Sequence, residues 1–313
     1  MAFPCVSRPA AVQGRCRRWL SLALAAAAVT GPAAASPPDA RLAGSGTAAA
    51  ADTRAPHVAS SGVRDLYPTA ATAYALAVDN ELLWGRNLHV RRAPASLTKL
   101  LTALVLLDSH WNPDALVPVS DESARATRPR LGVRAGDSLR AADALNAMLV
   151  QSANDACLAL VQHAATRVTE FAGEMNQRAR QLGMRDSSFV NPCGFDAAGQ
   201  YSTAADLLLL ARAAYAEPRI ARIVGQAHGV LRTNSGMDVS FANTNQLLGR
   251  LEGVLGLKTG YTAQAGYCLI ALDEQSGHRV WLVMLDARQR WWSAHQIISD
   301  AVAVMVARDT FMP

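Results

Sequence analysis

Hydrophobic residues in the middle of the chain recur with the spacing of α-helices. Residues 96–108 carry an apolar stripe of leucine and valine that is too wide for a helix lying on a surface. We therefore expect this helix to be buried in the middle of the domain. The same periodicity, together with start and stop signals, predicts further helices, the first two separated by the polar segment 151–154. They cover residues 138–163, 169–181, 203–215 and 293–307.

Short runs rich in β-branched and aromatic residues lie towards both ends of the chain and predict strands. Residues 73–78 and 82–84 flank Asp79-Asn80, an arrangement typical of a β-hairpin. Later runs are close enough in sequence for antiparallel pairing, and residues 273–278 predict a turn between the last two. These runs cover residues 229–233, 239–241, 255–261, 267–272 and 280–285. Together the elements indicate an α+β domain, an antiparallel sheet packed against helices with a mostly helical subdomain.

The amino-terminal segment has the pattern of a secretory signal. A cluster of arginines precedes an apolar run at residues 19–29, which ends at Gly31-Pro32 and is followed by alanines. The run is shorter than the ~20 residues that a bilayer span requires. We expect residues 1–35 to be a cleaved signal peptide, with an uncleaved membrane anchor as the alternative.

Composition and charge narrow the class of protein. Residues 36–63 are rich in Ala, Ser, Gly and Pro and lack aromatic residues, which predicts a disordered linker before a folded domain at 64–313. The chain has formal charge +5, but residues 1–35 contain four arginines and no acid, so the remainder carries only +1. A nucleic-acid-binding protein needs a basic surface, so this class is disfavoured.

The cysteines and histidines suggest neither a disulfide framework nor a metal centre. Beyond residue 35 only Cys157, Cys193 and Cys268 remain, so at most one disulfide can form. Cys157 and Cys268 have apolar neighbours, and we expect them to be small core residues rather than half of a bridge. The seven histidines are scattered and no CxxC or HxxxH pattern occurs, so we expect no metal and no cofactor.

Lysine is used at only two positions, although 28 of the 30 basic residues are arginine. A buried ammonium can lose its proton, whereas a guanidinium stays charged, so the two lysines are candidates for acid–base chemistry. Lys99 lies three residues after Ser96, one turn along the same helix face. A neutral amine there can take the proton of the serine hydroxyl and make it a nucleophile. The helix start also offers backbone N–H groups to a developing oxyanion.

The second lysine lies in Lys258-Thr259-Gly260, inside a predicted strand and followed by Tyr261. A cation beside a hydroxyl can bind a carboxylate, Gly260 permits close approach of a substrate backbone, and the Tyr261 N–H can complete an oxyanion hole. A phosphate-binding loop is excluded, because Leu257 separates the glycine from the lysine and the required glycine spacing is absent.

Ser152 and Asn154 form a third polar motif, at the break between two apolar helices. Ser152 can relay a proton towards a leaving nitrogen, and Asn154 can hold both a substrate amide and the Lys99 ammonium. An ordinary helix cap is the alternative explanation for this pair. Each of the three motifs is weak evidence by itself. Their occurrence in one chain, with both lysines of the sequence in two of them, is much stronger evidence for a catalytic site.

In these motifs the chain resembles the penicillin-binding serine enzymes with SxxK, SxN and KTG motifs. The closer resemblance is to peptidase family S11, the low-molecular-mass D-alanyl-D-alanine carboxypeptidases, and it covers roughly residues 68–300. It implies a β-lactamase/DD-peptidase-like fold for the catalytic domain. Besides the three motifs, the stretches that carry it are Leu182-Gly183-Met184, Asn243-Thr244-Asn245 and Tyr261-Thr262.

The resemblance implies roles for these residues. Ser96 would be acylated by a peptidoglycan stem peptide, with Lys99 as base and with Ser152 and Asn154 as the relay and positioning pair. The substrate carboxylate would meet Lys258 and Thr259, β-lactams would acylate Ser96 as covalent inhibitors, and water would release the acyl group. For the terminal carboxylate, an arginine at 288 or 290 is a further candidate.

There are three alternatives to a carboxypeptidase function, and one of them stays open. DD-endopeptidase action on crosslinks competes with carboxypeptidase action, which we favour on the Ser152–Asp155 stretch. A class A β-lactamase is disfavoured because no Glu-x-x-Leu-Asn segment lies between the second and third motifs. A non-catalytic wall-binding module would not need the Ser96 and Lys99 pair. We expect an exported protein, periplasmic and either soluble or loosely wall-associated, without a stable membrane anchor after signal cleavage.

Overall fold

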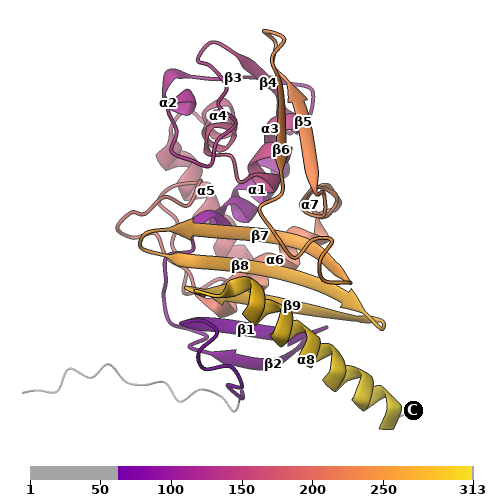
Figure 1. The fold of residues 1–313 in the computed structure, drawn as a ribbon. Coiled ribbons are helices and arrows are strands. Elements are labelled where there is room, and N and C mark those ends of the chain that lie inside the picture. The colour runs from indigo at the N-terminus through magenta and orange to yellow at the C-terminus, as the bar shows by residue number, and fades with distance from the viewer. Residues whose placement is uncertain (1–62, 312–313) are drawn as a thin grey trace, which may run out of the picture. The chain divides into compact units, whose positions relative to one another are not determined.

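A computed structural model describes residues 63–311 of the protein. The predicted signal peptide and all but the last residue of the predicted linker lie outside the described residues. The centre of the fold is a five-stranded antiparallel sheet in the order β2-β1-β9-β8-β7 (Figure 1). Its strands are β1 (Ala73–Val78), β2 (Glu81–Arg86), β7 (Val254–Thr262), β8 (Gly266–Gln275) and β9 (His278–Leu285).

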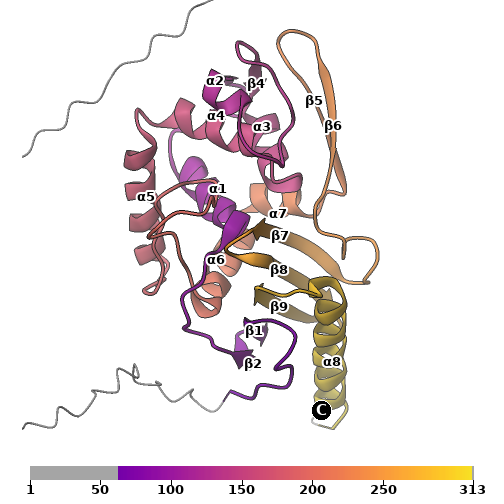
Figure 2. The same ribbon diagram turned by 60° about the vertical axis from the view of Figure 1, so that its left-hand side comes forward.

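Both faces of the sheet are covered, because successive side chains of a strand point to opposite faces. On β1, Ala73, Ala75 and Ala77 belong to the core shared with the helical region, whereas Tyr74 and Leu76 belong to a second core under α8 (Arg290–Phe311). Figure 2 shows α8 on one side of the sheet and the other helices on the opposite side. The central strands are therefore apolar at nearly every position.

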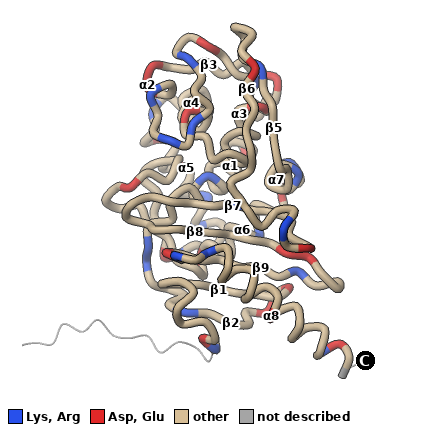
Figure 3. The backbone as a smooth tube through the Cα atoms, viewed as in Figure 1, with Lys and Arg blue, Asp and Glu red and all other residues tan. Residues whose placement is uncertain are grey.

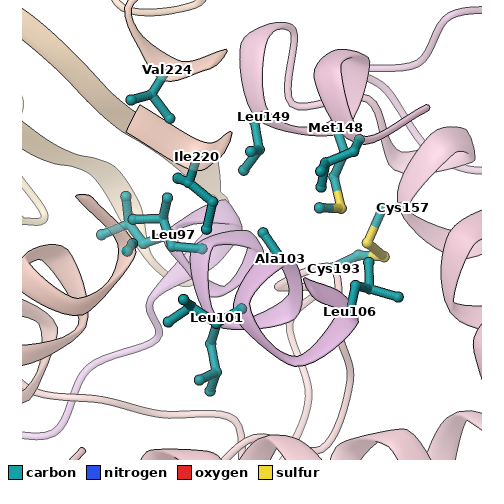
Figure 4. Close-up of a cluster of buried hydrophobic side chains, with 14 of the residues drawn as sticks. Leu97, Leu101, Ala103, Leu106, Met148, Leu149, Cys157, Cys193, Ile220 and Val224 are labelled. Atoms are coloured by element: carbon teal, nitrogen blue, oxygen red, sulfur yellow. A yellow bond between two sulfur atoms is a disulfide. The ribbon is translucent and has the colours of Figure 1, made fainter. Parts of the chain in front are cut away.

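The helical part begins with a short 3-10 helix, η1 (Ala95–Thr98), which runs directly into α1 (Lys99–Asp108). Every residue of α1 except Asp108 is buried, as the sequence predicts for 96–108. Figure 4 shows α1 surrounded by apolar side chains of neighbouring elements, among them Met148 and Ile220. The remaining helices are α2 (Asp121–Ala124), α3 (Ala141–Val150), α4 (Asn154–Ala164), α5 (Val168–Gln181), α6 (Ala204–Ala216) and α7 (Pro218–Val224).

Two small two-stranded antiparallel sheets complete the helical part. β3 (Leu116–Pro118) pairs with β4 (Ser138–Arg140), and β5 (His228–Arg232) pairs with β6 (Asp238–Ala242). The prediction that residue 138 opens a helix is wrong by three residues. Leu139 is buried opposite Val117 while its neighbours Ser138 and Arg140 are not, which is the alternation of a strand, and the helix begins at Ala141.

The expectation for Cys157 is also wrong. Cys157 and Cys193 form a disulfide with an S–S distance of 2.07 Å, and Figure 4 shows it among the apolar side chains beside α1. Apolar neighbours in sequence indicate burial but not pairing, because the partner comes from a loop 36 residues away. Cys268 is a free, buried thiol, as expected, and burial raises its pKa to about 11.

Positions of positively and negatively charged residues are interspersed along the described chain (Figure 3). No helix within residues 63–311 combines the length and the apolar composition that crossing a bilayer requires. Within the same range, no three His, Cys, Asp or Glu side chains gather as a metal ion would need.

Candidate active site

Ser96 lies in η1, immediately before the buried helix α1. Its predecessor Ala95 has a left-handed backbone (φ 49°), which turns the chain sharply into the helix. Ser96 is partly exposed, whereas Leu97, Thr98 and Lys99 are buried. The Ser96 hydroxyl therefore lies at the edge of a packed region, and the residues that directly follow it in the chain are buried in η1 and α1.

Lys99 is fully buried, and its Nζ lies 2.8 Å from Ser96 Oγ. The same nitrogen lies 2.8 Å from Asn154 Oδ1 and 2.7 Å from the Cys193 carbonyl oxygen. Asn154 Nδ2 donates to the Thr127 carbonyl at 2.9 Å, so its oxygen must be the atom that faces the lysine. The Lys99 nitrogen therefore has three partners, one of which is the candidate nucleophile.

These partners determine how a neutral Lys99 amine would be oriented. The amide and carbonyl oxygens can only accept hydrogen bonds, so together they use both N–H groups of the amine. Its lone pair is then left for the hydroxyl of Ser96. Burial lowers the pKa of Lys99 well below its ordinary value, and the positive charge of Lys258 lowers it further. Both the protonation state and the geometry favour proton transfer from serine to lysine.

Lys258 lies on β7, the edge strand of the sheet, and is also buried. Its Nζ donates to the Thr259 carbonyl at 3.1 Å. Burial lowers the pKa of Lys258 to about 7, and the charge of Arg290 contributes to the shift. The Thr259 hydroxyl lies 2.6 Å from that of Thr244, which positions it beside the lysine.

Gly260 is the point at which β7 passes η1. A Cβ on Gly260 would lie 2.9 Å from Ala95 Cβ and 3.0 Å from the Ser96 nitrogen, so only glycine allows this approach. The close approach places the Ser96 backbone N–H beside the edge of the sheet. Tyr261 follows with 58% of its residue surface exposed and packs against Tyr267, with ring centroids 4.6 Å apart.

Ser152 lies between α3 and α4 in a left-handed backbone conformation (φ 64°). Its hydroxyl is buried, and no described group forms a hydrogen bond with it. The structure therefore brings Ser96, Lys99 and Asn154 together by direct contacts, whereas Ser152 has no hydrogen bond to any of them. A buried hydroxyl without a partner is unusual and leaves a donor and an acceptor free.

Two residues that contact this site had no role predicted from the sequence, and a third had a predicted role in carboxylate binding but no location. The Cys193 carbonyl accepts from Lys99, and nothing in the local sequence indicates it. Thr244 lies in the Asn243-Thr244-Asn245 stretch that carried part of the resemblance. Arg290, named earlier beside Arg288 without a location, donates through Nη1 to the carbonyls of Gly260 (2.9 Å) and Cys268 (3.2 Å). It thus lies behind β7 and next to Lys258.

Comparison with known sequences places the chain in a family. The sequence profile of Peptidase S11, described as D-alanyl-D-alanine carboxypeptidase, matches residues 65–289. The protein belongs to this family. The match contains every residue described in this site except Arg290, which follows its last residue.

Individual relatives carry two kinds of name. D-alanyl-D-alanine carboxypeptidase DacF of Bacillus subtilis is 30% identical over 211 residues, which cover 66% of this chain and 54% of that protein. A D-alanyl-D-alanine endopeptidase of Pseudomonas aeruginosa is 32% identical over 223 residues, 69% of this chain and 72% of that protein. The chain spans about half the length of DacF and of the Escherichia coli carboxypeptidase DacD.

Solved structures confirm the predicted fold class. The Streptomyces K15 DD-transpeptidase superimposes with a TM-score of 0.71 at 26% identity, over 77% of this chain and all of that one. The carboxypeptidase DacD of Francisella tularensis gives a TM-score of 0.68 at 26% identity, over 74% of this chain and 70% of that one. The α+β, β-lactamase/DD-peptidase-like fold expected from the sequence is therefore the observed one.

Proposed function

We propose that the protein is a serine-type D-alanyl-D-alanine carboxypeptidase that removes the terminal D-Ala of peptidoglycan stem peptides. Residues 64–313 would form its catalytic domain. The observation that carries the proposal is the contact between Lys99 Nζ and Ser96 Oγ at 2.8 Å, made by a fully buried amine whose pKa is lowered. Such a pair generates a nucleophile without a histidine.

In the acylation step, neutral Lys99 takes the hydroxyl proton of Ser96 while Oγ attacks the carbonyl carbon of the penultimate D-Ala. The oxyanion that forms would be bound by the backbone N–H groups of Ser96 and Tyr261. Support for this comes from Gly260, whose lack of a side chain lets the Tyr261 end of β7 approach the Ser96 nitrogen. The C–N bond then breaks, and Ser96 carries the acyl group.

The leaving nitrogen must receive a proton as the C–N bond breaks. We assign this relay to Ser152, because its buried hydroxyl has a free donor and a free acceptor within the described structure. The proton would travel from the Lys99 ammonium through Ser152 to the departing D-Ala. Asn154 would hold the substrate amide and the lysine in register. Water then attacks the ester, with Lys99 again acting as base.

The carboxylate of the terminal D-Ala would bind Lys258 and the Thr259 hydroxyl. A pKa near 7 means that Lys258 is only partly charged at neutral pH in the free enzyme. An incoming carboxylate stabilises the ammonium form, and that charge in turn keeps Lys99 neutral. Substrate binding would thus favour the protonation states that the reaction needs.

DD-endopeptidase action on peptide crosslinks is the second candidate. A relative named D-alanyl-D-alanine endopeptidase is 32% identical to this chain, a value similar to the 30% of the carboxypeptidase DacF. Both reactions use the same acyl-enzyme and differ in the leaving group, which is free D-Ala in one and a crosslinked side chain in the other. Pentapeptide and crosslinked muropeptide substrates, compared at equal enzyme concentration, distinguish them.

We further propose that the protein is exported and acts in the periplasm, soluble or loosely wall-associated, after cleavage of residues 1–35. Support comes from the positively charged flank, the short apolar run and the alanines of the segment. Expression of the full chain in an export-competent host and intact-mass measurement test this. A mass that begins at Ser36 agrees with cleavage, and an unprocessed mass contradicts it.

The catalytic proposal is tested by mixing the purified protein with benzylpenicillin and measuring its intact mass, beside a Ser96→Ala variant. We expect the wild type alone to gain one whole penicillin. Consumption of the drug without a lasting adduct would instead indicate a β-lactamase. Intact drug and no adduct would contradict the acyl-enzyme altogether.

A further inference from the structure

The two oxygens that orient the Lys99 amine come from two separate elements. Asn154 is the first residue of α4, and Cys193 lies in the loop between α5 and α6. One turn after Asn154, α4 carries Cys157, which forms the disulfide with Cys193. The disulfide therefore joins α4, which carries the Asn154 oxygen bound by Lys99, to Cys193, whose carbonyl oxygen Lys99 also binds.

Other contacts hold each element separately. Asn154 is bonded through its backbone N–H to the Pro129 carbonyl at 2.8 Å and through Nδ2 to Thr127. The Thr102 hydroxyl on α1 donates to the Pro192 carbonyl at 2.6 Å. None of the hydrogen bonds among residues 63–311 joins the 189–195 loop directly to α4. Within this range the disulfide is the direct bond between the two elements.

The relative position of the two acceptors matters because it sets the direction of the lone pair on Lys99. If one oxygen moves away, an N–H group of the amine is free to rotate towards Ser96, and the lone pair then points elsewhere. The loop also packs against the backbone next to the nucleophile, because a Cβ at Gly194 would overlap the Ala95 carbonyl and lie 2.9 Å from the Ser96 nitrogen. A misplacement of about 1 Å at a reacting group can cost two orders of magnitude in rate.

We propose that the Cys157–Cys193 disulfide is a positioning element for Lys99, and that it acts by fixing the Asn154 and Cys193 oxygens relative to each other. This inference rests on the proposed function. Neither cysteine touches the substrate, so the effect passes through the lysine. Both cysteines are fully buried, in the same apolar region as α1.

Loss of the disulfide has a predictable effect on the Lys99 pKa. Burial is the largest cause of its lowering, so water entering a loosened pocket would raise the pKa towards its ordinary value. The charged group that faces Lys99 from β7 is Lys258. On α4 the neighbouring Asp155 carboxylate instead accepts from the backbone N–H groups of Leu131 and Gly132. The acid limb of the pH–rate profile would therefore move to higher pH.

The test is the double variant Cys157→Ala, Cys193→Ala, measured for acylation by benzylpenicillin over a range of pH. We expect the acylation rate constant at neutral pH to fall roughly 10- to 100-fold. The dissociation constant of the non-covalent complex should stay within a factor of about two, because the carboxylate site is untouched. The acid limb should shift upwards. Cys268→Ala removes a thiol of similar burial without breaking the disulfide and should match the wild type.

A general loss of stability must be separated from positioning. Ile298→Ala removes a buried side chain from the core under α8, on the far side of the sheet, and serves as a matched destabilised variant. It should lower the melting temperature while leaving the acid limb in place. Cys157→Val with Cys193→Ala refills volume and provides a second disulfide-free variant if the first does not fold.

The outcomes separate the inference from the function. A wild type without an adduct contradicts the proposed function itself. A wild type that is acylated, with disulfide-free variants acylated at the same rate and with the same acid limb, contradicts the positioning role. Failure of both disulfide-free variants to fold would assign the disulfide to folding and likewise overturn it.

Discussion

At the scale of single residues, the two lysines differ in what surrounds their nitrogen atoms. Lys99 Nζ has three oxygen partners at 2.7 to 2.8 Å, one of them the Ser96 hydroxyl. Lys258 Nζ has one backbone partner at 3.1 Å, the Thr259 carbonyl. The first nitrogen is held in one orientation, whereas the second keeps N–H groups for a ligand. This difference fits the roles proposed for the two residues, Lys99 as the base and Lys258 as the group that binds the substrate carboxylate.

Replacing Lys99 with arginine tests the base. Lys99→Arg keeps a positive charge but cannot lose a proton, so acylation by benzylpenicillin should fall by about three orders of magnitude or more. Intact mass against time measures the rate. Full activity in this variant would show that Lys99 is not the base.

The pH dependence of kcat/KM tests both lysines together. Acylation needs Lys99 neutral, so the rate falls as pH drops through its lowered pKa. Substrate binding needs Lys258 charged, so the rate also falls as pH rises through about 7. We expect a bell-shaped profile for a D-Ala-D-Ala peptide, measured by release of D-Ala.

The variant Lys258→Arg tests whether deprotonation of Lys258 causes the fall in rate at alkaline pH. A guanidinium does not titrate in this range, so the limb should disappear while the acid limb remains. The loss of activity at neutral pH should be smaller than for Lys99→Arg, because charge is what this position supplies. An alkaline limb that persisted in Lys258→Arg would have to come from another group.

The residues of the site could be predicted from sequence to different extents. Ser96 and Lys99 are three apart on a helix, so their contact follows from local geometry. The contact of Asn154 with Lys99 spans 55 residues and was expected only because the motif suggested a role for it. Cys193 acts through its backbone carbonyl, which every residue has, so side-chain chemistry gave no signal for it. The pairing of Cys157 with Cys193 was also missed, because the two cysteines are 36 residues apart and no local pattern shows that they meet.

At the scale of elements, the site depends on how closely β7 can approach η1. Gly260→Ala would place a methyl group against Ala95 Cβ and the Ser96 backbone nitrogen, neither of which is the end of a flexible side chain. The strand must then move outwards, and we expect acylation to slow about tenfold or more, a cost of about 1.4 kcal/mol in the barrier.

A second glycine provides the control for Gly260→Ala. Gly173 lies inside α5, is exposed, and a Cβ there would meet nothing within 4 Å. Gly173→Ala should raise stability by about 0.5–1 kcal/mol, because alanine favours a helix, and should leave acylation unchanged. Equal acylation rates in both variants would contradict the importance of the approach at Gly260.

Helices and strands were predicted best where the hydrophobic periodicity of their own sequence was clear. α1, α5, α6 and the strands of the central sheet lie within a few residues of the predicted positions. β4 has only three residues and depends on pairing with β3, which no local pattern reveals. α7 was not predicted, since its seven residues are too few for a clear period.

At the scale of the whole domain, one histidine contacts both the end of α8 and the turn between β1 and β2. His278 begins β9, and its Nδ1 lies 2.8 Å from Asp79 Oδ2, in the turn between β1 and β2. Its Nε2 lies 2.9 Å from Asp309 Oδ2, near the end of α8. Hydrogen bonds to the two carboxylates raise the pKa of His278.

This pKa shift makes part of the stability depend on pH. Because the folded-state pKa is raised, the stabilisation is fully present below the unfolded value of about 6.5 and is lost as pH rises through the raised one. The melting temperature of the wild type should exceed that of His278→Ala most at about pH 5.5–6 and least at about pH 9. A difference that grew with pH would contradict the assignment.

The burial of both lysines also governs how the chain can be cut. A lysine-specific protease has only two sites in the entire sequence, and these two lysine residues are 0% and 1% exposed. Cleavage needs an extended segment in the protease cleft, so neither site can be cut until η1 and α1, or β7, leave the fold. The rate of digestion would therefore measure how often the elements that carry the candidate active site unfold, and it would not respond to local opening elsewhere in the domain. A β-lactam bound to Ser96 should slow that digestion, because it stabilises only the closed form.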